Sequence, residues 1–250
     1  MENDIDLTLI VPAYNEVKAI AKTLAEAQSY LTQHHLKYEI IVSADGTDGT
    51  RELVSGLAKA DPRLSVIGSS ERKGKGYGVR QAVFLARGKI IGFTDADNKT
   101  PITELDKVLP WFEQGYDLVI GSRSLKTTQI IRRQPLYRRM GSFGFRCFMK
   151  SLIHLPGLID TQCGFKFFKR DIAKDLFNRQ QIDGYMFDTE ILYLAQQSHY
   201  RLMQVGIVWK DDGDSRLVLF RGNVRNALDV FKIRFGTQRQ GLSVCPKTPA

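Results

Sequence analysis

Two aspartates that stand two residues apart, Asp95 and Asp97, are the side chains best placed for chemistry. They follow an apolar run that predicts a buried strand, so the chain can turn there and direct both carboxylates at one cation. Hard oxygen ligands in a partial set suit Mg²⁺ or Mn²⁺, with phosphate oxygens and water completing the shell. A solvated loop or helix start is the competing interpretation, because Asp also favours such positions. The position after an apolar strand favours the metal site.

A second acidic segment, from Asp45 to Thr50, also follows an apolar run. The Asp45 carboxylate can accept hydrogen bonds from a nucleobase or a ribose, and the neighbouring glycines allow close approach to the backbone. Asp48 or Thr50 is expected to cap the next helix, so we assign only Asp45 to ligand binding.

A glycine-rich basic segment spans residues 72–78 and carries Lys75. Its spacing is neither that of a Walker loop nor that of a dinucleotide-binding fold. It is either a phosphate contact, with Lys75 as the donor-binding residue, or a flexible loop.

The net charge of +9 is unevenly distributed over the 250 residues. Residues 118–159 hold no Asp or Glu and carry +8, and residues 216–250 carry +6, which leaves −5 for the rest. Basic residues mixed with aromatic ones predict helices that lie in a membrane interface, although charge runs are usually solvated faces. Nucleic-acid binding is the rival interpretation of this charge, and the strand-end carboxylates argue against it because they repel phosphate.

Elements that could position these residues alternate along the first half. Apolar runs predict strands at 7–12, 38–42, 64–67, 89–94 and 117–122, with helices at 17–33, 51–59, 78–86 and 102–112. Repeated strand–helix–strand units predict an α/β, Rossmann-like fold with a mostly parallel central sheet flanked by helices. The carboxyl ends of such strands are where ligands bind, and three of them carry polar or acidic residues.

The second half is less regular. One or two helices are expected in 135–155, a helix at 188–197, a strand at 203–209 and a basic amphipathic helix at 218–235. No run is apolar enough for a membrane-spanning helix, the N-terminus does not read as a signal peptide, and three cysteines without zinc spacing favour a reduced compartment. We therefore expect a cytoplasmic protein bound peripherally to the cytoplasmic face of a membrane.

Several segments, in this order, resemble the inverting family 2 glycosyltransferases of GT-A fold. These are residues 11–16 (Val-Pro-Ala-Tyr-Asn-Glu), 44–50 (Ala-Asp-Gly-Thr-Asp-Gly-Thr) and 95–97 (Asp-Ala-Asp). Within the family, residues 121–123, 160–166 and 187–190 are similar to enzymes that act on dolichyl or polyprenyl phosphate, the β-glucosyltransferases above all. The resemblance implies a GT-A domain over 1–215, with a donor half at about 1–122 and an acceptor half at about 123–215, followed by a helix and tail over 216–250.

The resemblance also implies roles for individual residues. Pro12, Tyr14 and Glu16 would line the nucleotide pocket, and Asp45 would bind the base. Asp95 and Ala96 would contact the donor, and Asp97 would hold the metal on its diphosphate.

The acceptor phosphate is expected to meet arginines of the acid-free segment. The resemblance points to Arg123 and Arg138, although Arg139 aligns equally well with the second of these positions. Arg132 lies in the same segment. The planar guanidinium matches phosphate bidentately, which suits this task. Lys99 departs from the mannose synthases, which often carry a Gln there, and this difference favours the glucosyltransferase-like branch.

Asp188 and Glu190 have two open interpretations. Either supplies a general base, as acidic residues do in relatives that act on hydroxyl groups, or Asp188 caps a helix. Lys166 either pairs with Asp188 or contacts phosphate. Because a phosphate oxygen is already anionic near neutral pH, a phosphate acceptor needs no general base.

The expected function is metal-dependent, inverting transfer of a hexose from a nucleotide sugar to a polyprenyl or dolichyl phosphate at the membrane surface. UDP-glucose is the expected donor. The alternatives are a mannosyltransferase that uses GDP-mannose and a family 2 enzyme that acts on a saccharide hydroxyl. The catalytic set would be Asp95, Asp97, Arg123, Arg138 and Asp188.

Overall fold

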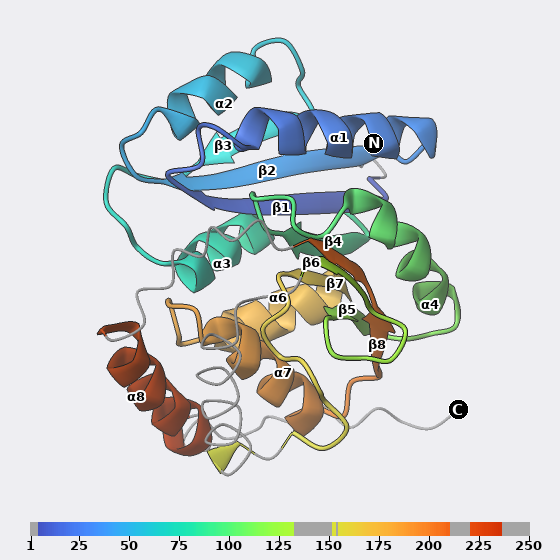
Figure 1. Ribbon diagram of the computed structural model, residues 1–250, viewed down its shortest axis with the longest axis vertical. Coiled ribbons are helices and arrows are strands. Elements are labelled where there is room, and N and C mark those ends of the chain that lie inside the picture. The colour runs from blue at the N-terminus through green and yellow to red at the C-terminus, as the bar shows by residue number, and fades with distance from the viewer. Residues whose placement is uncertain (1–4, 133–151, 154, 211–220, 237–250) are drawn as a thin grey trace.

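The computed structural model describes residues 5–132, 152–153, 155–210 and 221–236 (Figure 1). Its strands are β1 (Leu7–Tyr14), β2 (Tyr38–Asp45), β3 (Leu64–Ile67), β4 (Ile90–Thr94), β5 (Leu118–Ser122), β6 (Gln129–Arg132), β7 (Phe165–Lys169), β8 (Leu202–Gly206) and β9 (Val208–Lys210). Its helices are α1 (Ile20–Gln33), α2 (Thr50–Ala58), α3 (Lys75–Leu85), the 3₁₀ helix η1 (Ile102–Lys107), α4 (Leu109–Glu113), α6 (Arg170–Arg179), α7 (Phe187–Gln197) and α8 (Arg221–Gly236).

Seven strands form one sheet in the order β3-β2-β1-β4-β7-β5-β8, and β6 pairs with β9 in a separate ribbon. Every pairing in the main sheet is parallel except those of β7, which runs antiparallel to both β4 and β5. This confirms the expected mostly parallel sheet. The α/β alternation of the first half builds the parallel part, because a crossover helix returns each strand in the same direction.

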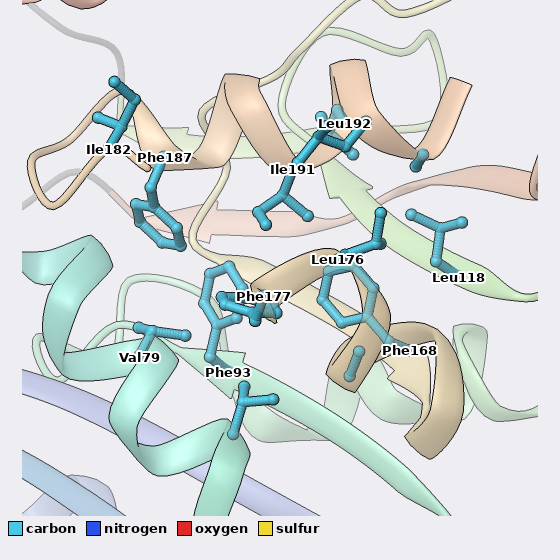
Figure 2. Packing of buried hydrophobic residues seen from close by; sticks show 14 of the residues in the cluster. Val79, Phe93, Leu118, Phe168, Leu176, Phe177, Ile182, Phe187, Ile191 and Leu192 are labelled. Carbon is cyan, nitrogen blue, oxygen red and sulfur yellow. The ribbon is translucent and has the colours of Figure 1, made fainter. Parts of the chain in front are cut away.

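Helices cover both faces of the sheet (Figure 1). On one face, α1, α2, η1 and α4 bury an apolar cluster that includes Leu24, Val54 and Leu105. On the other face, α3, α6, α7 and α8 bury a second cluster, part of which Figure 2 shows around Phe93, Phe177 and Phe187. The fold therefore has three layers, with the sheet between two layers of helices.

The antiparallel strand β7 fits tightly between its neighbours. Gly92 of β4 lies opposite Phe167 of β7, and a Cβ at Gly92 would collide with the Phe167 ring. This glycine is therefore required for the close approach of an aromatic ring, and it helps to fix the register of β7.

Four differences from the sequence-based expectations have local causes. β1 continues past Pro12 to Tyr14. Its pairing with β4 stops at Ile10, so the last residues of β1 pair with β2 alone. A proline, which has no N–H, is tolerated in a strand at such an edge position. The helix expected at 102–112 is split into η1 and α4 next to Pro110, whose ring is incompatible with a continuous α-helix. The strand expected at 203–209 is divided between β8 and β9. The glycine-rich segment 72–78 leads directly into α3, which begins at Lys75 rather than at residue 78.

The segment expected to be helical at 135–155 lies almost wholly outside the described residues. The helix expected at 218–235 corresponds to α8, and Val230 and Ile233 of this helix belong to the same core cluster as α7. Among the residues that the structure describes, no helix has the length and apolar character needed to cross a bilayer.

Candidate active site

Five strand ends meet at one edge of the sheet. The carboxyl ends of β2, β1 and β4 are neighbours there, and Tyr14 at the end of β1 lies opposite Asp45 at the end of β2. Because β7 is antiparallel, its amino end reaches the same edge, where Phe165 pairs with Thr94. The carboxyl end of β5 follows on the other side of β7. The polar segments after β1, β2, β4 and β5 and before β7 therefore converge.

Asp45 is held by the backbone of the segment that follows β3. Its Oδ1 accepts a hydrogen bond from the Ser69 N–H at 3.2 Å, and its Oδ2 accepts one from the Lys73 N–H at 2.8 Å. The carboxylate is therefore oriented before any ligand arrives. Asp48 Oδ1 accepts hydrogen bonds from the N–H and hydroxyl of Thr50, the first residue of α2, at 3.0 and 2.6 Å, but the N-cap of α2 is Gly49 and no side chain caps it, so the expected cap by Asp48 or Thr50 is wrong.

Tyr14 is part of an exposed stack at this edge. The Arg72 guanidinium lies 4.2 Å from the centre of the Tyr14 ring, and its Nη2 donates to the Tyr185 hydroxyl at 3.0 Å. Cation–π contact of this kind holds the rings and the guanidinium in one orientation. Pro12 lies further down β1, half-buried, and the Glu16 N–H donates to the Thr50 hydroxyl at 2.9 Å.

A row of alternating charges runs inward from Asp95. The Lys75 ammonium lies 2.6 Å from Asp95 Oδ1 and 3.9 Å from Asp188 Oδ2. Asp188 in turn forms a very short ion pair with Lys166, a fully buried residue whose Nζ also donates to the Cys163 carbonyl at 2.6 Å. Asp188 therefore pairs with Lys166, and it is not the cap of α7, whose first turn has no side-chain cap.

The protonation states in this row follow from its partners. Burial alone would lower the pKa of the Lys75 ammonium, but the Asp95 and Asp188 carboxylates outweigh it and raise that pKa above its usual range. Burial raises the pKa of the Cys163 thiol to about 12, so this residue stays protonated and is not a nucleophile.

Gly164 explains how Asp95 can sit at the start of β7. A Cβ at Gly164 would overlap the Asp95 carboxylate, so only glycine leaves that space free. The Asp95 side chain remains 44% exposed and open to a ligand on its outer side.

Asp97 has its own lysine. Lys99 Nζ lies 2.9 Å from Asp97 Oδ2, and the Asp97 side chain is 32% exposed. Between the two aspartates, Ala96 is buried and its carbonyl accepts a hydrogen bond from the Thr23 hydroxyl at 2.8 Å. No three His, Cys, Asp or Glu side chains cluster among the described residues, so within them Asp95 and Asp97 form at most a two-carboxylate set.

Arg123, just after β5, is clamped by Asp160. Its Nε and Nη2 donate to the two Asp160 oxygens at 2.8 and 2.9 Å, and its backbone N–H donates to Oδ2 at 2.9 Å. Burial opposes ionisation of Asp160, but the charge and hydrogen bonds of Arg123 prevail and lower the pKa of Asp160 to about 2. A phosphate would meet Arg123 through its remaining Nη1 or displace Asp160.

The other expected acceptor residues are not placed in the site. Arg132 is the last residue of β6. Arg138 and Arg139 lie outside the described residues.

Glu190 points away from the row of charges. Its Oε1 and Oε2 accept hydrogen bonds from the N–H groups of Gln181 and Ile182, both at 2.9 Å. Burial raises the pKa of Glu190 to about 7, although these two N–H groups oppose the shift. Glu190 therefore secures the segment between α6 and α7.

Four residues at the site were not singled out from the sequence: Arg72, Asp160, Gly164 and Tyr185. Asp160 and Gly164 lie in the 160–166 segment that carries the family resemblance, which was a usable signal. No sequence signal indicated Tyr185, because its partner Arg72 is 113 positions away in the chain.

A parallel sheet whose carboxyl edge gathers an Asp-x-Asp pair, a fixed Asp45 and basic side chains defines a glycosyltransferase of GT-A fold. The chain belongs to Glycosyl transferase family 2, which matches residues 8–177. It is 32% identical, over 93% of its length and 75% of the relative, to a dolichyl-phosphate beta-glucosyltransferase of Dictyostelium discoideum. The human dolichyl-phosphate beta-glucosyltransferase is 30% identical over 91% of this chain and 74% of its own.

Solved structures agree with this fold. The glucosyl-3-phosphoglycerate synthase of M. tuberculosis superposes with a TM-score of 0.67 at 18% identity and covers 93% of this chain and 81% of its own. The same enzyme has been solved with Mn²⁺ and uridine-diphosphate, at a TM-score of 0.64 and 19% identity over 93% of this chain and 80% of its own. At this identity the likeness confirms the GT-A fold and nothing finer.

Proposed function

We propose that this chain transfers glucose from UDP-glucose to a dolichyl or polyprenyl phosphate, with inversion at the anomeric carbon. The observation that carries the proposal is the match of over nine-tenths of the chain to dolichyl-phosphate beta-glucosyltransferases. The fully engaged state of Asp188 and Glu190 supports it, because neither carboxylate is free to act as a base on a hydroxyl acceptor. An anionic phosphate acceptor does not need one.

Asp95 and Asp97 would hold a divalent cation, Mg²⁺ or Mn²⁺, together with the donor. Two partly exposed carboxylates fit such an ion, since hard cations bound through substrate phosphates commonly take one or two carboxylates. When bound, the cation would neutralise charge on the leaving diphosphate. The M. tuberculosis synthase solved with Mn²⁺ and uridine-diphosphate is consistent with this assignment.

The chain's own residues would bind and orient the two anionic reactants. Pro12, Tyr14 and Glu16 would line the nucleotide pocket beside Asp45, whose oriented carboxylate suits a base or ribose donor group. Lys75 would turn from Asp95 toward the diphosphate, and Ala96 would contact the donor through its backbone. These contacts offset the repulsion between donor and acceptor phosphates, which is the main task of the site.

The acceptor phosphate would bind to arginines after β5, and the first of them, Arg123, has its guanidinium paired with Asp160. Arg132, Arg138 and Arg139 complete the proposed acceptor set. Asp188 contributes by fixing Lys75 rather than by moving a proton. In this scheme residues 1–122 serve the donor, 123–215 serve the acceptor, and 216–250 form a C-terminal segment.

The test is a transfer assay with purified protein, Mg²⁺ or Mn²⁺, and labelled UDP-glucose or GDP-mannose. Dolichyl phosphate and a free saccharide are offered together as acceptors. The proposal expects label from UDP-glucose in the organic phase. Label from GDP-mannose in that phase would make the chain a mannosyltransferase, and label only on the saccharide would overturn the lipid acceptor.

A further inference from the structure

We infer that the outer face of α8 docks on an anionic lipid bilayer. The inference deepens the proposed function, on which it rests, by naming the surface that brings the enzyme to a lipid-borne phosphate. It depends on the burial, charge and position of α8 (Arg221–Gly236).

The inner face of α8 is part of the protein core. Val230 and Ile233 are fully buried in the cluster that α7 and α6 share, and Asn226 and Asp229 are also buried on this side. Figure 1 shows α8 beside α7, on the side of the sheet away from α1 and α2. The helix is therefore anchored in one orientation, and its opposite face is presented outward.

The outer face carries a row of large apolar side chains. Leu228, Phe231 and Phe235 are 58%, 44% and 59% exposed. Their spacing of three and four residues puts them on one side of the helix, and the two phenylalanine rings stack with centres 6.3 Å apart. Large apolar side chains that are partly exposed in one row mark an interaction surface.

Positive charges surround this row. Arg225 and Lys232 are exposed beside Leu228, and Arg234 lies on the other flank, 6.0 Å from the Phe235 ring. The only acidic residue of α8, Asp229, is buried. Apolar side chains between basic ones fit an interface in which the rings enter the acyl boundary and the cations meet anionic headgroups. A two-fold contact with a second copy would instead bring Arg225 and Lys232 close to their own equivalents.

The docking face lies one segment away from the candidate active site. The Asp229 carboxylate approaches Gly184, and Asp183 of the same segment accepts a hydrogen bond from Arg80 of α3 at 2.8 Å. The first turn of α3 packs on this segment too, because a Cβ at Gly74 would collide with the Asp183 carbonyl. Since α3 begins at Lys75, a bilayer bound to α8 would face the side of the molecule that holds the site.

The experiment measures co-sedimentation with phosphatidylcholine vesicles that contain or lack phosphatidylserine, without donor or acceptor. The test variant combines Leu228→Ser, Phe231→Ser and Phe235→Ser. The matched control combines Leu57→Ser, Phe84→Ser and Leu85→Ser, three apolar residues that are 39%, 43% and 57% exposed elsewhere. A charge variant, Arg225→Gln with Arg234→Gln, leaves the apolar row and the pair of Lys232 with the buried Asp229 intact, and it guards against misfolding of the triple variant.

The wild type and the matched control should bind the phosphatidylserine vesicles. The triple variant should bind at least about tenfold more weakly, because it loses apolar area that would leave water. The charge variant should lose about fivefold per removed charge. Wild-type protein that ignores these vesicles, or test variants that bind as tightly as wild type, would overturn the inference. A triple variant that only converts a dimer to a monomer would overturn it in favour of a self-interface.

A second readout separates this inference from the proposed function. Transfer of glucose to a short-chain, water-soluble prenyl phosphate should be unchanged in the triple variant, because α8 does not form the site. Absence of such transfer in the wild type would contradict the proposed function and leave the vesicle result standing. Normal transfer without any vesicle binding would contradict only the docking face.

Discussion

Each aspartate of the Asp-x-Asp pair is paired with a lysine, Asp95 with Lys75 and Asp97 with Lys99. A divalent cation at the proposed site would compete with these ammonium groups, so its affinity would depend on the lysines as well as on the carboxylates. A bound donor diphosphate would relieve the competition, because it would offer the lysines another anion. We therefore expect metal to bind weakly to the free protein and more tightly together with nucleotide.

Replacement of Lys99 tests this competition. Lys99→Gln removes a cation 2.9 Å from Asp97, so Mn²⁺ should bind between about threefold and tenfold more tightly in the presence of UDP. Titration calorimetry measures the affinity directly. The control is Lys107→Gln, which removes an ion pair with Glu104. Equal Mn²⁺ affinities in Lys99→Gln and wild type would show that Lys99 does not compete with the metal.

The buried pair of Lys166 and Asp188 is the second feature at this scale. Asp188→Asn leaves the fully buried Lys166 without its counter-charge, which should cost about 3–5 kcal/mol of unfolding free energy. The double variant Asp188→Asn with Lys166→Met should be clearly more stable than the sum of the single changes predicts. Denaturant unfolding of the four proteins measures this coupling.

Activity of the same variants distinguishes a positioning residue from a base. If Asp188 only fixes Lys75, Lys166→Met should lower kcat about as much as Asp188→Asn does. If Asp188 is a base, Asp188→Asn should abolish the reaction, while Lys166→Met should keep both the activity and the acidic limb of its pH profile.

At the scale of elements, the site depends on how closely β7 begins beside the end of β4. Gly164→Ala puts a methyl group where the Asp95 carboxylate lies, so Asp95 must move. Because displacement by about 1 Å at such a site can cost 100-fold in rate, we expect at least about a 100-fold loss of kcat/KM. Gly56→Ala in α2 is the control, since a Cβ there meets nothing within 4 Å and should add about 0.5–1 kcal/mol of stability. Full activity in Gly164→Ala would contradict this placement of Asp95.

The free energy of unfolding should depend on pH through Glu190, which holds the segment between α6 and α7. Burial raises the pKa of Glu190 from 4.5 to about 7 in the folded protein, so the folded state holds this proton more tightly than the unfolded chain does. Its contribution is fully present below about pH 4.5 and is lost as the pH rises through about 7. Between pH 5 and pH 8 the wild type should therefore lose about 1–3 kcal/mol relative to Glu190→Gln. Chemical unfolding at both pH values provides the check, and a constant difference between the two proteins would rule out this role of Glu190.

Local patterns predicted the elements that follow one another along the chain. The strands at 38–42, 64–67 and 89–94 and the helix at 188–197 match β2, β3, β4 and α7 to within a few residues, because apolar periodicity and strand-end polar residues are local signals. Strand β7 was missed, together with α6 and β6. β7 pairs with β4 and β5, which are distant in the chain, so no local sequence pattern indicates this pairing. Lys166 also interrupts the apolar residues of β7, so the segment does not resemble a buried strand.

The same limit applies to the site. The positions of Asp45, Asp95 and Asp97 at the carboxyl edge of the sheet could be predicted, because each lies at or just after the end of an apolar strand. The partners that orient them come from distant segments, as Lys75 does for Asp95 and Asp160 does for Arg123, and spacing carries no information about such pairs. Residue type indicates the chemistry, and the order of strands decides which groups meet.

At the scale of the whole molecule, charge divides the protein into an acidic body and basic segments. The body presents carboxylates at the sheet edge, where a cation and a nucleotide would bind, and α8 presents basic and aromatic side chains outward. The proposed reaction, between a nucleotide sugar and a lipid phosphate at a membrane, needs both features. One group of residues must balance the charge of the donor, and another must hold the lipid. The net charge of +9 is therefore better understood by its placement than by its total.

The most direct measurement is the structure of the product that forms from UDP-glucose and dolichyl phosphate. NMR of the organic-phase product determines both the linkage and the anomeric configuration. The account predicts glucose joined to the lipid through one phosphate in the β configuration, which is inversion of the α-linked donor. An α-linked product, or glucose found only on a water-soluble acceptor, would contradict it.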